Sequence, residues 1–185
     1  EREAVVVAVL PGSRQSEIRR LAWRFFRAVA LSHHAQPAIK FIVPAVPQWR
    51  DAITTAAKDA GVYANVQILN GQSHLALAAS DVTLIASGTA TLEAALFKRP
   101  MVIAYNMSWM SWQIMRRKKL QPWVGLPNIL CDDFVVPELL QDAATPDGLA
   151  LKVPGVVPRL SATPGRLERP APRLGEHDGQ GFDAD

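Results

Sequence analysis

Two stretches of the chain follow the same plan, in which a short apolar run ends in a glycine turn and a helical pattern begins at once. The first has a β-branched run at residues 4–10 and a turn at residues 11–14, after which apolar side chains recur at three- and four-residue spacing. The second has an apolar run at residues 82–86, a Ser-Gly-Thr turn at residues 87–89 and an Ala- and Leu-rich segment. Each stretch predicts a strand, a tight turn and a helix.

Three further apolar runs complete an alternating order of strands and helices. The predicted strands are residues 4–10, 39–43, 66–69, 82–86 and 101–105, and the predicted helices between them are residues 18–29, 48–60, 73–79 and 90 to about 98. Continuous apolar runs are typical of strands buried on both faces of a parallel sheet. The order therefore predicts an α/β fold, a Rossmann-like parallel sheet with helices on both faces. Both glycine turns then lie at the carboxyl edge of the sheet, where ligands bind.

The turn after the fourth predicted strand carries residue types that suit an anion. Gly88 lets the backbone approach a ligand closely, while Ser87, Thr89 and Thr91 offer hydroxyl groups. The first turn of the next helix points N–H groups outward, which favours a phosphate, and Glu93 is placed to accept hydrogen bonds from a sugar. An ordinary helix start, capped by Ser or Thr with Glu93 in a capping box, fits the same spacing equally well.

Length and composition favour one globular domain in the cytoplasm. A chain of 185 residues with 49% hydrophobic residues buries a substantial core. We find no apolar run as long as a membrane span, and the charged amino terminus is not a signal peptide. The single cysteine, Cys131, argues against a disulfide framework or a cysteine metal cluster and fits a reducing compartment, so neither a metal nor a cofactor is expected.

The excess of positive charge lies in one run that follows an aromatic segment. The net charge is +3, and residues 151–185 hold equal numbers of basic and acidic side chains, so the excess lies before them. Tryptophan beside a basic cluster favours an anionic membrane surface over nucleic acid, and a helix with a core face and a solvated basic end is the equal alternative. The candidate membrane contacts are Trp109, Trp112, Arg116, Arg117, Lys118 and Lys119.

The carboxyl-terminal part of the sequence changes character twice. Residues 125–130, which contain Asn128, are predicted to be a loop, residues 136–141 a short helix, and a further helix begins at residue 145. Residues 151–185 are rich in Pro, Gly and Arg and lack a hydrophobic period. We therefore predict one domain over residues 1–150 and a disordered or loosely attached tail over 151–185.

Five motifs, in their order and spacing, make residues 5–150 resemble the lipid-A-disaccharide synthase family. They are Leu10-Pro11-Gly12-Ser13-Arg14 with Glu17-Ile18, residues 80–93 around Ser87-Gly88-Thr89-Ala90-Thr91, residues 98–102 with Tyr105, Leu126-Pro127-Asn128-Ile129-Leu130, and residues 136–141. The resemblance implies the C-terminal, nucleotide-sugar-binding half of a glycosyltransferase-B architecture. It also implies a protein that is attached peripherally to the cytoplasmic side of the inner membrane, and it is compatible with a homodimer.

The resemblance implies a role for each candidate residue. The family transfers 2,3-diacylglucosamine from UDP to the lipid acceptor 2,3-diacylglucosamine 1-phosphate with inversion and forms the β-1,6 lipid A disaccharide. The carried-over roles are Arg14 on the phosphates of the UDP-2,3-diacylglucosamine donor, Ser87, Gly88, Thr89 and Thr91 around the diphosphate, Glu93 on the ribose, and Asn128 in the donor pocket. Backbone N–H groups and an arginine would stabilise the charge that develops on UDP as it leaves.

The sequence departs from the family in two ways. The acceptor half, which is expected before Glu1 and carries the general base, is missing, and Asp81, Asp132 and Asp133 are interpreted as element boundaries and an exposed loop. Residues 151–185 resemble nothing in the family, which suggests a shifted reading frame.

Two alternatives to a transferase part stay open at this point. The chain could be a non-catalytic module that binds UDP or a nucleotide sugar, or a protein that binds membrane surfaces through the basic run. His74 lies near a predicted helix start close to the ligand edge, where a structural role is more common than a ligand contact.

Overall fold

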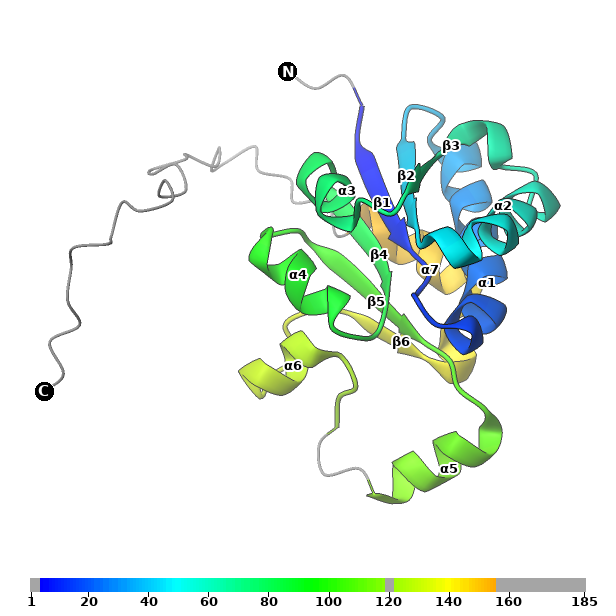
Figure 1. Cartoon of the computed structure of the whole chain (residues 1–185). Helices are drawn as coiled ribbons and strands as arrows, with labels where there is room; N and C mark the ends of the chain where they lie inside the picture. The colour runs from blue at the N-terminus through cyan, green and yellow to red at the C-terminus, as the bar shows by residue number, and fades with distance from the viewer. Residues whose placement is uncertain (1–3, 119–121, 156–185) are drawn as a thin grey trace, which may run out of the picture.

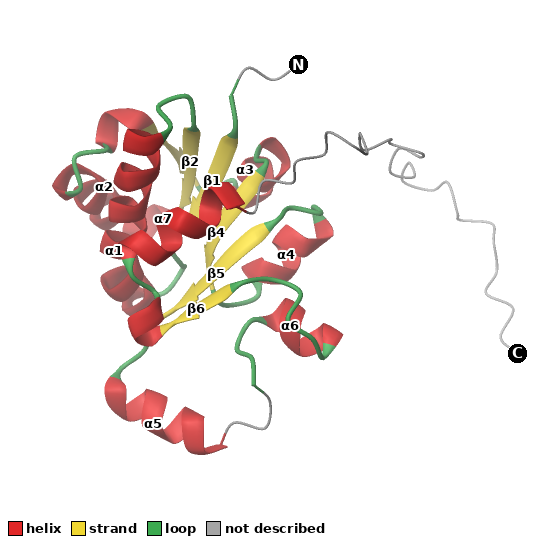
Figure 2. Cartoon of the chain, turned by 180° about the vertical axis from the view of Figure 1, so that it is seen from behind, coloured by secondary structure: helices red, strands yellow, loops and turns green. Residues whose placement is uncertain are grey.

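The computed structural model describes residues 4–118 and 122–155, which form a sheet of six parallel strands between two layers of helices (Figures 1 and 2). The strands are β1 (Val6–Leu10), β2 (Lys40–Ala45), β3 (Val66–Asn70), β4 (Val82–Ala86), β5 (Met101–Tyr105) and β6 (Glu138–Leu140). The α-helices are α1 (Gln15–Ala35), α2 (Arg50–Asp59), α3 (Ser73–Ala79), α4 (Ala90–Leu96), α5 (Trp109–Lys118), α6 (Leu126–Cys131) and α7 (Pro146–Gly155). Single 3₁₀ turns lie at Pro47–Trp49, Tyr63–Asn65 and Gln141–Ala143.

The strand order is β3-β2-β1-β4-β5-β6, with every neighbouring pair parallel. This is the doubly wound order, in which the direction of winding reverses between β1 and β4. The register pairs Val7 with Val82 and Leu10 with Ile85, so β1 and β4 end level with each other. The predicted α/β sheet is thus confirmed, and the turns after β1 and β4 stand side by side at the point of reversal.

The core lies in two layers, one on each face of the sheet. Helices α1, α2 and α7 cover one face, and α3 and α4 cover the other (Figure 1). Successive side chains of β1 alternate between them: Val7 and Val9 belong to the cluster under α1, whereas Ala8 and Leu10 belong to the cluster under α3 and α4. The predicted apolar face of α1 is confirmed, with Phe25 fully buried. The sheet is therefore held from both sides, which fixes its carboxyl edge.

Two predictions for the region after residue 122 are wrong. Residues 138–140, within the predicted helix 136–141, form the edge strand β6, and the N–H of Ile103 donates to the carbonyl of Pro137 at 2.9 Å. Proline disfavours the helical conformation of the residue before it, and pairing with β5 supplies backbone partners instead. The predicted loop at 125–130 is mostly helix α6, because Pro127 in its first turn loses no hydrogen bond there.

The last helix changes the predicted domain boundary. Helix α7 begins at Pro146, as predicted, but it continues to Gly155, so residues 151–155 belong to the helix rather than to the tail. Leu149 is fully buried in the cluster under α1. Arg24 of α1 donates through Nη1 to the carbonyl of Ala144 at 2.8 Å, which ties α1 to the start of α7. The rest of the predicted tail, residues 156–185, lies outside the described residues.

Candidate functional site

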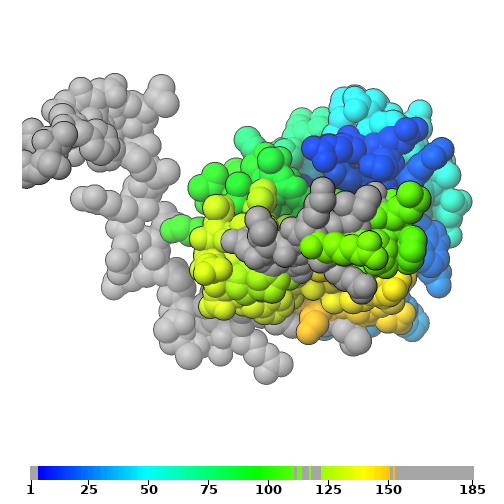
Figure 3. Space-filling model, turned by 90° about the horizontal axis from the view of Figure 1, so that it is seen from below, coloured from blue at the N-terminus to red at the C-terminus, as the bar shows by residue number. Residues whose placement is uncertain are grey.

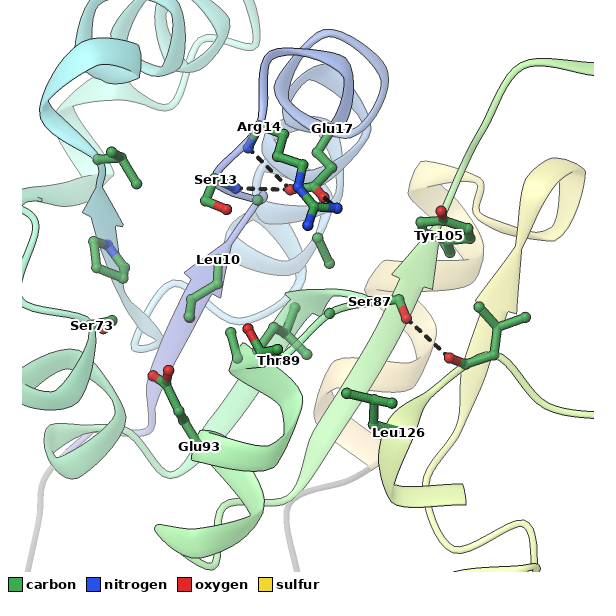
Figure 4. A pocket seen from close by; sticks show the side chains of 18 residues that line it. Leu10, Ser13, Arg14, Glu17, Ser73, Ser87, Thr89, Glu93, Tyr105 and Leu126 are labelled. Carbon is green, nitrogen blue, oxygen red and sulfur yellow. Dashed lines mark hydrogen bonds and ion pairs between the residues drawn. The ribbon is translucent and has the colours of Figure 1, made fainter. Parts of the chain in front are cut away.

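A cavity of about 520 Å³ lies at the carboxyl edge of the sheet, where the winding reverses between β1 and β4 (Figure 4). The turn after β1 and the turn after β4 form two of its walls, and residues from β2, α3, β5 and α6 complete it. Its lining includes Leu10, Gly12, Ser13, Arg14, Glu17, Pro44, Val46, Ser73, Ser87, Gly88, Thr89, Ala90, Glu93, Tyr105, Val124 and Leu126. The structure thus brings together five of the predicted site residues, which are Arg14, Ser87, Gly88, Thr89 and Glu93.

The turn after β1 is closed by a carboxylate of its own helix. Gly12 adopts a φ of +119°, and Glu17 Oε2 accepts hydrogen bonds from the N–H groups of Ser13 at 2.9 Å and Arg14 at 3.2 Å. The guanidinium of Arg14 lies 3.6 Å from Glu17 Oε1, and its side chain is 82% exposed. Because Glu17 already holds these two backbone donors, the turn presents the arginine side chain to the cavity. Sequence reasoning missed this role of Glu17, although its position three residues after Arg14 is that of a capping box.

The turn after β4 is open on its cavity side. The N–H of Ser87 donates to Ala104 at 2.9 Å and the hydroxyl of Ser87 to the carbonyl of Val124 at 3.3 Å. Within the described residues, no group accepts a hydrogen bond from the N–H groups of Gly88, Thr89 or Ala90. All three residues line the cavity, and N–H groups without acceptors at the start of a helix suit an anion.

Thr91 is not among the residues that line the cavity, and its contact with a ligand stays a prediction. The residue is fully buried, and its Oγ1 donates to the carbonyl of Gly88 at 2.7 Å. The N–H of Thr91 donates to the same carbonyl at 3.1 Å. The hydroxyl therefore holds the shape of the turn, which spacing along the chain could not distinguish from a hydroxyl that faces outward.

Asn128 is also buried and is not among the residues that line the cavity, so its predicted place in the donor pocket stays a prediction. Its Oδ1 accepts hydrogen bonds from the N–H groups of Val135 at 2.9 Å and Val136 at 2.8 Å, and its Nδ2 donates to the carbonyl of Val136 at 2.9 Å. Asn128 thus fastens α6 to the segment before β6. The wall residue Leu126 comes from the same helix.

A second carboxylate that sequence reasoning missed, Glu138, anchors the entry to α6. Its oxygens accept hydrogen bonds from the N–H groups of Val124, at 3.1 and 3.2 Å, and Gly125, at 2.6 Å. Gly125 is buried, and a Cβ there would lie 2.6 Å from Ile103 Cδ1. Glu138 becomes a strand residue only through pairing with β5. The local sequence pattern therefore does not predict its contact with the N–H groups of Val124 and Gly125.

Glu93 lies in the cavity wall contributed by α4, with a side chain 39% exposed. Its Oε2 lies 3.3 Å from Nε2 of His74, at the start of α3. Figure 4 shows the carboxylate of Glu93 on the side of the cavity opposite Arg14. The cavity thus has a cation at one end, open backbone donors in the middle and an acceptor at the other end.

The other carboxylates that we considered are structural or peripheral, as predicted. Asp81 Oδ2 accepts a hydrogen bond from the N–H of Val6 at 2.9 Å, at the amino end of the strands. Asp132 is an exposed residue with a φ of 49° at the end of α6, and Asp133 accepts from the N–H of Phe134 at 2.7 Å. None of the three lines the cavity. In the described part of the chain no group of three or more His, Cys, Asp or Glu residues could hold a metal ion.

Helix α5 carries the predicted membrane contacts and extends below the carboxyl edge of the sheet (Figures 1 and 2). Seen from below, the described atoms of α5 lie on the near side of the molecule (Figure 3). Trp109 is 74% exposed, Trp112 is half-buried and Arg117 is exposed. Arg116 and Lys118 belong to the same helix, and Lys119 lies outside the described residues. Among the helices that the structure describes, none is long and apolar enough to cross a membrane.

Solved structures that the chain resembles define its class. ADP-heptose LPS heptosyltransferase II of Escherichia coli superposes with a TM-score of 0.58 at 12% identity, over 85% of this chain and 47% of that one. WaaG, a glycosyltransferase involved in lipopolysaccharide biosynthesis, superposes with a TM-score of 0.50 at 16% identity, over 89% of this chain and 44% of that one. At these identities the likeness shows the fold alone. The chain is a Rossmann-like domain of the glycosyltransferase-B type, with its cavity at the switch point of the sheet.

The sequence identifies the family within that class. The family model described as Lipid-A-disaccharide synthetase matches residues 1–157, so the chain belongs to this family. The Lipid-A-disaccharide synthase of Albidiferax ferrireducens is 62% identical over an alignment that covers 93% of this chain and 48% of that protein. The chain therefore spans about half the length of this relative. An alignment over 93% of the chain includes residues beyond 150, so the expectation that residues 151–185 resemble nothing in the family is wrong.

Proposed function

We propose that the chain is the donor-binding part of a lipid-A-disaccharide synthase. The reaction would transfer 2,3-diacylglucosamine from UDP to 2,3-diacylglucosamine 1-phosphate, forming the β-1,6 disaccharide and releasing UDP. The observation that carries this proposal is the cavity at the β1–β4 switch point, with Arg14, the open N–H groups after β4 and Glu93 around it. Membership of the family supports the choice of substrates.

The diphosphate of the donor would lie over the turn after β4. Three backbone N–H groups there, of Gly88, Thr89 and Ala90, have no acceptor within the described residues. Arg14 would pair with the phosphates from the opposite wall, because a mostly exposed guanidinium 3.6 Å from its carboxylate partner is weakly held and free to turn. Ser87 and Thr89 add hydroxyl groups at the same wall.

Glu93 would accept hydrogen bonds from the ribose hydroxyls. It lies on α4 beyond the turn that would hold the phosphates, which suits a nucleoside attached to a diphosphate. A carboxylate accepts from two neighbouring hydroxyls at once, whereas it repels a phosphate. Thr91 and Asn128 would support the site indirectly, through the Gly88 carbonyl and through α6.

The chemistry proposed for this half of the enzyme is stabilisation of the leaving group. The 6-hydroxyl oxygen of the acceptor would attack the anomeric carbon with inversion as the bond from that carbon to the UDP oxygen breaks, and a carboxylate base would take the hydroxyl proton. None of the carboxylates that line the cavity is proposed for that role, so the base would come from a part of the enzyme outside residues 4–118 and 122–155. Arg14 and the open N–H groups would stabilise the negative charge that develops on UDP.

The same proposal places the protein at the cytoplasmic side of the inner membrane, as a peripheral protein. The exposed Trp109 and Arg117 of α5 support it, because indole rings settle among lipid headgroups and arginine pairs with anionic lipid. Binding to vesicles that contain anionic lipid should fall with salt and after Arg116, Arg117, Lys118 and Lys119 are changed to Glu. Equal binding by the reversed variant would refute the membrane role and leave the donor site untouched.

Calorimetric titration of the chain with UDP tests the donor site directly. Glu93→Ala and Arg14→Ala should each weaken binding by about tenfold or more, because each removes a contact to a charged or polar part of the ligand. Arg27→Ala, at an exposed position of α1 outside the cavity, is the matched control and should bind as the original chain does. A chain that is folded by circular dichroism and yet binds no UDP would overturn the proposal.

A further inference from the structure

We propose that His74 is a positioning residue, which holds the carboxylate of Glu93 in the orientation that recognises the ribose of the nucleotide. This inference rests on the proposed donor site, because it deepens the role given to Glu93. His74 itself is not among the residues that line the cavity, whereas its neighbour Ser73 and its partner Glu93 are. Its effect on a ligand would therefore pass through Glu93.

The position of His74 follows from the turn between β3 and α3. Gly71 and Gln72 both adopt left-handed conformations, with φ of 68° and 61°. Two such residues in succession reverse the chain sharply after β3, so α3 begins beside the cavity. Glutamine rarely adopts this conformation, which indicates that the surrounding structure requires the turn.

The imidazole of His74, whose side chain is 71% exposed, contacts two side chains of α4 and the residue after it. Glu93 and Phe97 are four residues apart, at the same face of α4 and its C-terminal end. The ring of His74 is 5.7 Å from that of Phe97 between centroids and tilted by 48°. Its Nε2 lies 3.3 Å from Glu93 Oε2. Phe97 thus contacts the ring, and in the tautomer that carries a proton on Nε2 the ring donates to one oxygen of the carboxylate.

In this arrangement the two carboxylate oxygens of Glu93 have different roles: Oε2 contacts His74, and Oε1 would bind the ligand. A contact from Nε2 to Oε2 restricts the rotation of the carboxylate and involves only one of its two oxygens, so Oε1 would be available to a ligand. A glutamate with no such partner samples several rotamers on the first turn of a helix. Binding a hydroxyl group then has an entropy cost, because the side chain must be held in one rotamer. His74 would remove part of that cost before the ligand arrives. The benefit would appear only with ligands whose hydroxyl groups bind to Glu93.

Two nucleotides separate this role from a structural one. UDP carries both ribose hydroxyls, and 2′,3′-dideoxy-UDP carries neither, so the ratio of their dissociation constants measures recognition of the ribose. We expect the original chain to prefer UDP by about tenfold or more, since a site built for hydroxyl groups discriminates against their loss. Glu93→Gln should lower this preference sharply. A substitution that only destabilises α3 would weaken the binding of both nucleotides equally and leave the ratio of their dissociation constants unchanged.

Two substitutions at His74 separate its ring from its N–H group. His74→Phe keeps a ring against Phe97 and removes the donor, so the preference for UDP should fall by about threefold, as expected for the loss of one hydrogen bond at a partly exposed position. His74→Gln keeps a donor and should retain the preference of the original chain. In a Glu93→Gln background, His74→Phe should have no further effect. His34→Phe, at an exposed position of α1, is the matched control.

The outcomes distinguish failure of this inference from failure of the proposed function. A chain that binds UDP with a strong ribose preference, unchanged in His74→Phe, would overturn the role of His74 and leave the donor site intact. A chain that binds both nucleotides equally would overturn the roles of Glu93 and His74 together. A folded chain that binds neither nucleotide would overturn the proposed function and this inference with it.

Discussion

The two glycine turns that meet at the switch point of the sheet have the same plan but differ in what fills them. After β1, the carboxylate of Glu17 accepts the N–H groups of Ser13 and Arg14, so the turn is complete within the chain. After β4, the N–H groups of Gly88 to Ala90 have no acceptor among the described residues. The first turn is closed by a carboxylate of the chain itself, whereas the second is where we propose that an anion from outside binds.

This difference separates structural from functional roles at positions that look alike in sequence. A Cβ on Gly12 would lie 2.5 Å from both Cβ and Oε2 of Glu17, whereas a Cβ on Gly88 would meet nothing within 4 Å. The fold requires glycine after β1. Packing does not require glycine after β4, where under the proposed function the absence of a side chain would let the donor phosphates approach the backbone.

The largest effect is expected at Gly12, whose replacement breaks the closed turn. Gly12→Ala forces alanine to a φ of +119° and into contact with Glu17, so the free energy of unfolding should fall by roughly 3 kcal/mol. Chemical denaturation measures this loss in the free energy of unfolding. Gly61→Ala is the matched control, because Gly61 has a φ of +72° with open space around it and should lose only about 1 kcal/mol. Equal losses at the two positions would contradict the role given to Glu17.

Asn128 extends the comparison to a third wall of the cavity, the one formed by α6. Like the turn after β1, this wall is held by hydrogen bonds from a side chain of the chain itself. Asn128→Ala removes the partner of the N–H and of the carbonyl of Val136 near a buried site, while the N–H of Val135 keeps the carbonyl of Asp133 at 3.1 Å, so unfolding should become easier by about 2 kcal/mol. Asn106→Ala, which loses one contact of 3.4 Å, should cost clearly less. A stable Asn128→Ala chain that fails to bind UDP would instead restore the direct ligand contact that the family resemblance implies.

Gly88→Ala tests the turn after β4, where an added side chain would meet no protein atom within 4 Å. The free energy of unfolding should change by less than about 0.5 kcal/mol, because the added methyl group meets open space. UDP should nevertheless bind about tenfold more weakly, since the methyl group would stand where the phosphates approach the N–H groups. Uridine, which lacks phosphates, serves as the control ligand and should bind both chains equally. Unchanged UDP affinity in the variant would show that the diphosphate lies elsewhere.

The sequence allowed a good prediction of the fold but only part of the site, and the reason is the range of the interactions. Strands β1 to β5 and the buried face of α1 follow from local periodicity, and the doubly wound order then places both turns at one edge. Spacing cannot show that the Thr91 hydroxyl turns inward to Gly88 or that Asn128 binds the backbone near β6. Those orientations depend on which residues from distant parts of the chain come near, as the formation of β6 beside β5 also does.

The smallest effect is expected at Lys98, where the structure holds a left-handed conformation without glycine. Lys98 has a φ of 54° just after α4, and its N–H donates to Ala95 at 2.8 Å while that of Arg99 donates to Ala94 at 2.9 Å. This is the helix ending at which glycine is usual. Lys98→Gly should therefore raise the free energy of unfolding by about 0.5–1 kcal/mol, measured by chemical denaturation. Lys58→Gly, within α2, is the opposite control and should lose about 1 kcal/mol. If Lys98→Gly gave no gain, backbone conformation alone would cost little in this domain, and the expected loss at Gly12 would have to come entirely from the contact with Glu17.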